Sequence, residues 1–253
     1  METTADLSGK VAVVTGGSRG IGAALVRGFA RAGADVVIAS RKAENCEALA
    51  AEVRDEIGTR ALAVGCHVGK WDDCDRLMDR VEENFGRCDV FVNNAGMSPL
   101  YPDLLSISEE YWDKVTSVNL KGPFRLGVRA GTLMAARDGG SIINVGTIGS
   151  LRPGSTELVY ACAKAGLNAL TIGLAEAFGP TVRSNALLPG SVATEISHVW
   201  TEETKELAIR STPLGRMGEA EDYVGPALWL ATASSAWVTG TIIRVDGGAY
   251  RQM

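Results

Sequence analysis

Short apolar runs alternate along the chain with longer segments in which apolar side chains recur every three or four positions. The runs are rich in β-branched residues and show almost no polar alternation, which is typical of strands buried on both faces of a sheet. The longer segments have the period of amphipathic helices. The pattern predicts seven strands, at residues 11–15, 35–39, 60–66, 89–92, 141–145, 182–187 and 241–245.

Strands that alternate with helices predict an α/β fold, with a doubly wound parallel sheet covered by helices on both faces. The chain has 253 residues, of which 46% are hydrophobic, enough for one large buried core. We therefore expect a single domain over residues 1–253, without an internal repeat or a linker. The longest irregular stretch starts at Pro189, and we expect a substrate lid over about residues 190–215.

The overall composition narrows the class of function. A net charge of −5, without any basic tract, disfavours nucleic acid as a partner. Five scattered cysteines without C-x-x-C spacing indicate neither a disulfide framework nor a zinc site, and they favour the reducing cytoplasm. The N-terminus lacks the pattern of a targeting signal, and we expect no segment with the roughly 20 apolar residues of a membrane span.

A glycine-rich loop at residues 16–22 joins the first predicted strand to a helical pattern. A dinucleotide pyrophosphate binds at such a helix N-terminus, where unpaired N–H groups and partial positive charge collect. A Cβ at Gly16, Gly20 or Gly22 would crowd the turn, the ligand or the strand beneath. The loop by itself is also compatible with an ordinary turn. The predicted cofactor-binding residues here are Gly16, Ser18, Arg19, Gly20, Ile21 and Gly22.

The end of the second predicted strand bears on the choice between NAD and NADP. A sheet that prefers NAD carries an acid there, which accepts hydrogen bonds from the ribose 2′-hydroxyl. This chain has Ser40 and Arg41 instead, and with Arg19 they can hold a 2′-phosphate. We therefore predict NADP(H), with NAD(H) as the alternative. The competing interpretation is that Arg41 and Lys42 form a solvated helix entrance.

Tyr160 and Lys164 stand one helical turn apart, so their side chains share a helix face. A phenol titrates at about pH 10, and a nearby ammonium favours the phenolate and lowers that pKa. Tyr160 is then suited to act as a general acid in ketone reduction and as a general base in alcohol oxidation. In isolation such a pair is usually a surface pair of little consequence.

Six motifs in this order resemble the short-chain dehydrogenase/reductase family, and the resemblance covers nearly the whole chain. They are TGGSRGIG at 15–22, NNAG at 93–96, VNLKG at 118–122, YACAK at 160–164, LPGSVAT at 188–194 and VDGG at 245–248. The resemblance implies a Rossmann-type sheet of seven parallel strands. It also implies an oxidoreductase that interconverts a secondary alcohol and a ketone by hydride transfer.

Four catalytic residues follow from the resemblance: Asn119, Thr147, Tyr160 and Lys164. Tyr160 moves the proton, and Lys164 tunes it and holds the nicotinamide ribose. Thr147 stands where the family has a serine, and its hydroxyl can donate the same hydrogen bond to the substrate oxygen in a narrower site. The Asn119 carbonyl holds a water in the family, and Pro123, four residues later, lacks the N–H that would bond this carbonyl.

The resemblance also implies cofactor contacts beyond the glycine loop. Val192, through its backbone, and Thr194, through its hydroxyl, would bind the nicotinamide carboxamide. His67 replaces an aspartate that the family places beside the adenine, and a structural role for this histidine is equally compatible with the sequence. The remaining expected contacts are Ser40, Arg41, His67, Val68, Asn94, Ala95, Gly96, Tyr160, Lys164, Pro189, Gly190, Val192 and Thr194.

The expected substrate pocket is apolar with aromatic edges, which suits a 3-oxoacyl, alicyclic or steroid-like carbonyl better than a sugar. Its wall is formed by Met97, Leu100, Tyr101, Leu151, Leu158, Val159, Ile196 and Trp200. Arg152 either meets an anionic group or is solvated.

Two helices, expected over residues 107–134 and 158–178, carry apolar residues on more than one face, including Leu167, Leu170, Ile172 and Leu174. Together with the resemblance they predict a homotetramer. Two functional alternatives stay open: an NAD-dependent alcohol dehydrogenase of the same family, and a catalytically silent nucleotide-binding regulatory protein. Thr147 and His67 suggest the silent protein, whereas the intact Tyr160, Lys164 and Asn119 argue against it.

Overall fold

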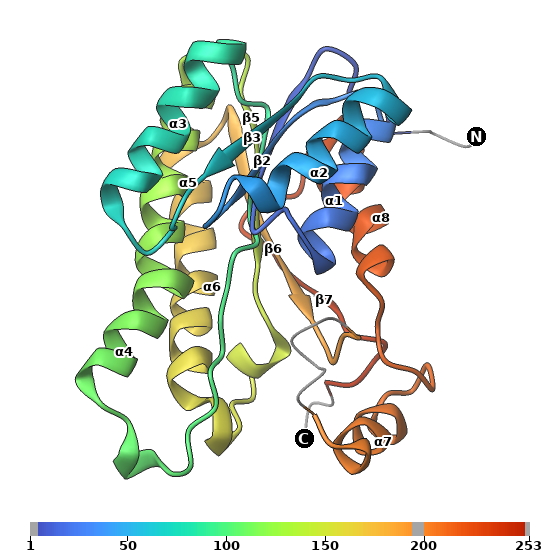
Figure 1. The fold of residues 1–253 in the computed structure, drawn as a ribbon. Helices are drawn as coiled ribbons and strands as arrows, with labels where there is room; N and C mark the ends of the chain where they lie inside the picture. The colour runs from blue at the N-terminus through green and yellow to red at the C-terminus, as the bar shows by residue number, and fades with distance from the viewer. Residues whose placement is uncertain (1–4, 194–199, 251–253) are drawn as a thin grey trace.

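A computed structural model describes residues 5–193 and 200–250. Within them lies one parallel sheet covered by helices on both faces (Figure 1). The strand order is β3-β2-β1-β4-β5-β6-β7, so the direction of winding reverses between β1 and β4. All seven predicted strands are confirmed, as β1 (Val11–Thr15), β2 (Asp35–Ser40), β3 (Ala61–Gly65), β4 (Val90–Asn93), β5 (Gly140–Val145), β6 (Val182–Pro189) and β7 (Ile242–Val245).

The helices pack in two layers. Buried side chains of α1 (Gly20–Arg31), α2 (Glu44–Glu52) and α8 (Val224–Ala231) cover one face of the sheet. Those of α3 (Trp71–Phe85), α5 (Gly122–Ala135) and α6 (Leu158–Phe178) cover the other face. Two further helices, α4 (Glu109–Thr116) and α7 (Glu202–Ser211), lie toward the carboxyl ends of the strands (Figure 1).

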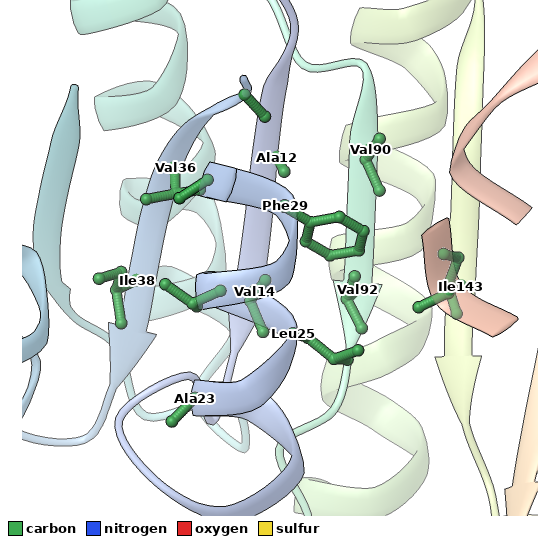
Figure 2. Close-up of a cluster of buried hydrophobic side chains, with 14 of the residues drawn as sticks. Ala12, Val14, Ala23, Leu25, Phe29, Val36, Ile38, Val90, Val92 and Ile143 are labelled. Atoms are coloured by element: carbon green, nitrogen blue, oxygen red, sulfur yellow. The ribbon is translucent and has the colours of Figure 1, made fainter. Parts of the chain in front are cut away.

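The strands are apolar throughout because both of their faces are covered. Val13 and Val14 are adjacent in β1, and each is fully buried in a different one of the two cores. Figure 2 shows the core under α1, where Leu25 and Phe29 lie over Val92 of β4. Each such side chain contributes about 1.5–3 kcal/mol when it is fully buried.

The helix expected over residues 107–134 is interrupted in its middle. A wide π-helical turn, Ser117–Lys121, separates α4 from α5, and the N–H of Gly122 bonds to the Ser117 carbonyl five residues back. Pro123 follows immediately and has no N–H to continue the usual ladder of α-helical bonds. The irregularity expected at this proline therefore takes the form of a widened turn.

Helix α6 is apolar over most of its length. With the turn before it, it forms a segment, Ser155–Phe178, that has the length and composition of a membrane span, with a mean hydropathy of 1.4. The sequence-based expectation that no segment reaches this composition is therefore wrong. Composition alone does not separate a span from a core helix, and α6 packs here against β6 and α5.

Candidate active site

The glycine loop is fixed by the segment that follows β4. Gly16 has a positive φ of 63°, and a Cβ built there would lie 2.9 Å from both the Ala95 Cα and the Asn94 Nδ2. A Cβ at Gly22 would overlap the Gly16 carbonyl oxygen. Asn94 Nδ2 donates hydrogen bonds to the carbonyls of Thr15 and Gly16, at 2.9 and 3.1 Å. Both close approaches require glycine.

Thr15 completes this junction, and sequence reasoning gave it no role. Its hydroxyl donates to the Val92 carbonyl and accepts the N–H groups of Asn94 and Ala95, at 3.1 and 3.2 Å. The available signal was its position: a hydroxyl residue at the end of the first strand, directly before the glycines. Thr15 therefore sets the spacing between the two loops that meet at the reversal point of the sheet.

The N-terminus of α1 suits an anion. Among the described residues, no side chain caps this helix, and its first turn holds no acid. In contrast, α2, α3, α4 and α7 each hold two acidic residues in their first turn. The first N–H groups and the positive end of the α1 dipole thus face the glycine loop without a competing carboxylate on the same helix. This arrangement fits a pyrophosphate, with Ser18, Arg19, Gly20 and Ile21 at the helix start.

A cavity of about 490 Å³ opens at the end of β2, lined by Arg41, Lys42, Ala43, Glu44 and Asn45. The Ser40 hydroxyl donates to the Lys42 carbonyl at 2.9 Å and accepts the Cys46 thiol, so it shapes the turn that forms the cavity. The sequence identified the basic residue at 41 but missed the lining by Lys42 and Asn45. It also missed Glu44, which places a carboxylate at the same cavity.

His67 is held in a turn. The ring Nδ1 of His67 accepts the Gly69 N–H at 3.2 Å. The backbone N–H of His67 donates to the Asp73 carboxylate at 2.9 Å. Val68 is buried beside it. The structure thus gives the His67 ring a local structural partner, which is the second of the two roles compatible with the sequence.

Tyr160 and Lys164 lie on α6, with the ammonium 5.8 Å from the centre of the phenol ring. Lys164 is 2% exposed, and its Nζ donates to the Val145 carbonyl at the end of β5, at 2.8 Å. Within the described part of the chain, the Tyr160 hydroxyl makes no hydrogen bond. The pair therefore shares one helix face, with the lysine anchored to the sheet and the phenol hydroxyl left to bond a ligand.

Burial controls the titration of both groups. It raises the pKa of Tyr160, and the Glu157 carboxylate raises this pKa further. Burial lowers the pKa of Lys164 to about 8. The expectation of a lowered Tyr160 pKa is therefore wrong for the chain's own groups, because burial of the phenolate and the Glu157 carboxylate both raise it.

Thr147 follows β5 and begins a short helical turn. Its Oγ accepts the Gly149 N–H at 3.1 Å, so the hydroxyl proton can still be donated to a substrate oxygen. Ser150, the nearest alternative hydroxyl, donates to the Thr147 carbonyl at 2.6 Å and accepts from Asn168 at 2.9 Å. Of the two side chains, Thr147 is thus the one whose hydroxyl proton is not already donated within the described residues.

Asn119 lies in the widened turn between α4 and α5, and its side chain is fully committed. Its Nδ2 donates to the carbonyls of Met97 and Val115, and its Oδ1 accepts the Met97 N–H. A Cβ built on Gly96 would lie 3.0 Å from this Oδ1 and 3.6 Å from the Lys164 Nζ. The turn, the loop after β4 and the catalytic helix therefore meet at Gly96.

The segment after β6 is tied to a distant loop. Gly218 exchanges backbone hydrogen bonds with Ser191 and Ala193, and Val192 forms a parallel bridge with it. Gly190, which follows Pro189, packs against Asp246 of the VDGG motif. Thr194, and Ile196 of the expected pocket wall, lie outside the described residues.

Glu157 is a site residue that sequence reasoning missed. One of its carboxylate oxygens lies against Gly149, to which the Thr147 hydroxyl is also close, and burial raises the pKa of Glu157. The signal was its spacing, because it stands three residues before Tyr160 and so reaches the same side of α6. The substrate end of the site therefore contains a carboxyl group as well as the expected apolar wall.

Comparison with known proteins gives matches over nearly the whole chain. The family model described as "Enoyl-(Acyl carrier protein) reductase" matches residues 16–250. The chain is 35% identical to "Dehydrogenase/reductase SDR family member 4" of Pongo abelii, covering 96% of this chain and 88% of that protein. It is 38% identical to "L-rhamnose 1-dehydrogenase (NAD(P)(+))" of Azotobacter vinelandii, covering 95% and 96%. A gluconate 5-dehydrogenase from Burkholderia cenocepacia, solved in complex with NADP and tartrate, superposes with a TM-score of 0.92 at 33% identity, over 97% of both chains.

Proposed function

The chain belongs to the short-chain dehydrogenase/reductase family, and within it we propose an NADP(H)-dependent oxidoreductase that interconverts a secondary alcohol and a ketone. The observation that carries this proposal is the position of the Tyr160 hydroxyl, without a protein partner in the described residues, on one helix with the buried Lys164. Sequence considerations favour a 3-oxoacyl, alicyclic or steroid-like carbonyl as substrate.

The proposed chemistry divides among the residues of the site. A bound nicotinamide supplies the hydride for ketone reduction and accepts one in alcohol oxidation. The Thr147 hydroxyl, whose oxygen already accepts a backbone N–H, donates its proton to the substrate oxygen and stabilises negative charge there. Tyr160 gives the proton to that oxygen in reduction and removes it in oxidation. Lys164, together with the nearby Asn119, relays protons to and from the phenol.

NADP is the favoured cofactor because Arg41 and Lys42 line the cavity at the end of β2. A guanidinium binds a phosphate through charge-assisted hydrogen bonds. The gluconate 5-dehydrogenase relative, which was solved with NADP, supports the same choice. NAD is the second candidate, because the Glu44 carboxylate at this cavity opposes a 2′-phosphate.

A steady-state screen tests the proposal. A panel of 3-oxoacyl thioesters, alicyclic ketones and steroid ketones is offered with NADPH and with NADH, and nicotinamide absorbance is followed. We expect turnover, with the higher kcat/KM for NADPH. A protein that binds the cofactor but turns over no carbonyl would instead be the catalytically silent regulator.

We also propose a homotetramer, although the residues that support it differ from those first considered. Leu167 and Leu174 are buried inside the chain, whereas Ile172 is 53% exposed. Further aromatic side chains exposed on the described surface are Trp71, Trp112, Phe124, Trp229 and Trp237. Apolar surface of this kind marks protein contacts. Light scattering at micromolar concentration is expected to give four times the chain mass, and a monomer mass would contradict the proposal.

A further inference from the structure

A second cavity, of about 340 Å³, lies between three segments that each follow the carboxyl end of a strand. Its lining comes from the segment after β5, from α7, and from the chain after β7, and comprises Arg152, Leu207, Arg210, Ser211 and Ala249. Thr147 and Tyr160 belong to the same edge of the sheet, and α7 lies beyond the carboxyl end of β7 (Figure 1). The volume is in the range of small-molecule sites.

The two arginines of this cavity differ from most others in the structure. Nine arginines of the described residues pair with a carboxylate, as Arg27 does with Glu52. Within residues 5–193 and 200–250, the side chains of Arg152 and Arg210 form no ion pair or hydrogen bond. Glu206 precedes Arg210 by one helical turn, yet no ion pair joins them. Two guanidinium groups from separate segments thus line one cavity, and no carboxylate of the described residues pairs with either.

A planar guanidinium is matched to the two oxygens of a carboxylate, which it binds through paired hydrogen bonds. We propose that Arg152 and Arg210 bind a carboxylate of the substrate, so that the protein acts on oxo acids and the corresponding hydroxy acids. This inference rests on the proposed function and names its substrate class. It assigns Arg152 the first of the two roles left open by the sequence and adds Arg210, which the sequence did not indicate.

The charge at the inner end of the site fixes the direction of the substrate. The Glu157 carboxyl and the Thr147 hydroxyl both lie near Gly149, and a carboxylate there disfavours a second one. An oxo acid therefore enters with its carbonyl toward Thr147 and Tyr160 and its carboxylate toward the two arginines. The exposed apolar side chain of Leu207 lies at the same cavity and contacts the methylene groups between the two ends.

The test compares acids with their neutral esters. Levulinate and its homologues lengthened by one, two and three methylene groups are each assayed with NADPH beside the matching methyl ester. In the wild type, at least one acid is expected to exceed its ester in kcat/KM by roughly 10- to 150-fold, the scale of a hydrogen bond between charged groups. Raising the ionic strength should reduce this ratio, because salt screens the exposed pair.

Arg152→Gln and Arg210→Gln should each raise the KM for the preferred acid and leave the kinetics of its ester unchanged. The matched control is Arg137→Gln, an exposed arginine that precedes β5 at the opposite edge of the sheet. An acid-to-ester ratio near one at every chain length, or a ratio that both variants retain, would overturn the proposal.

A direct binding measurement separates this inference from the proposed function. The affinity of the NADP⁺-loaded protein for the same acids is measured by calorimetry. Binding that both variants weaken supports the carboxylate site even where no ketone is reduced, and that result would contradict only the proposed activity. Reduction of the esters without any preference for the acids would contradict only the carboxylate site.

Discussion

Lys164 is expected to make the protein less stable at neutral pH, and replacing it should reveal by how much. Burial lowers the pKa of its ammonium from 10.5 to about 8. One pKa unit corresponds to about 1.4 kcal/mol, so a shift of about 2.5 units corresponds to roughly 3 kcal/mol. Because Lys164 is 2% exposed, solvent screening does not reduce this figure substantially.

The sign follows from proton binding. Between pH 8 and pH 10.5 the unfolded chain holds a proton on this lysine that the folded chain has released, so folding becomes more favourable as the pH rises. Below pH 8 both states are protonated, and the full penalty of burying the charge is present. Lys164→Met removes this penalty and also removes the hydrogen bond to the Val145 carbonyl, which shifts its stability by an amount independent of pH.

The assay is urea unfolding of the wild type and of Lys164→Met at several values between pH 7 and pH 11. The free energy of unfolding of the wild type should rise relative to the variant by about 3 kcal/mol across this range. Lys114→Met, at an exposed position of α4, is the matched control. A difference between wild type and Lys164→Met that stays constant with pH, or the same rise in the control, would refute the reasoning.

Three further predictions concern turnover. Arg41→Ala should lower kcat/KM with NADPH by roughly 10- to 150-fold and leave that with NADH unchanged, and a wild-type preference for NADH would contradict it. Thr147→Val should lower kcat by about 10²–10³-fold while Thr147→Ser stays active; activity of the valine variant within a few-fold of wild type would exclude Thr147 as the donor. Glu157→Gln should lower the pKa of Tyr160, because it removes a neighbouring negative charge, and so move the pH profile of alcohol oxidation toward lower pH. An unmoved profile would show that Glu157 does not act on the phenol.

Much of the fold could be predicted because the strands of a sheet covered on both faces are apolar at successive positions. Each strand is an apolar run, and the glycines after β1 mark where the chain turns toward α1. The wide turn before Gly122 was harder to foresee in detail, because proline removes a hydrogen bond without specifying which carbonyl takes the next one.

The site was predictable where one short segment carries the chemistry, as in the spacing of Tyr160 and Lys164. The properties that depend on burial could not be predicted. The raised pKa of Tyr160, for example, comes from the surrounding packing. Glu44 and Arg210 were also missed. Arg210 lines its cavity only after segments far apart in the sequence have come together. The Glu44 cavity is lined by five consecutive residues, 41–45, but a run of residues does not show that its turn encloses a cavity.

The hydrogen bonds between Thr15 and Asn94 imply that the glycine motif does not keep its conformation on its own. The Thr15 hydroxyl accepts a hydrogen bond from the Asn94 N–H, although the two residues are 79 positions apart in sequence. This bond exists only after β1 and β4 have paired. A fragment that ends before β4 would keep every residue of the loop at 16–22 and lose the scaffold that shapes it. In protein engineering, the smallest transferable dinucleotide site in this chain therefore extends from β1 through the segment after β4. Transplanting residues 16–22 alone would transfer their sequence without the contacts that fix their conformation.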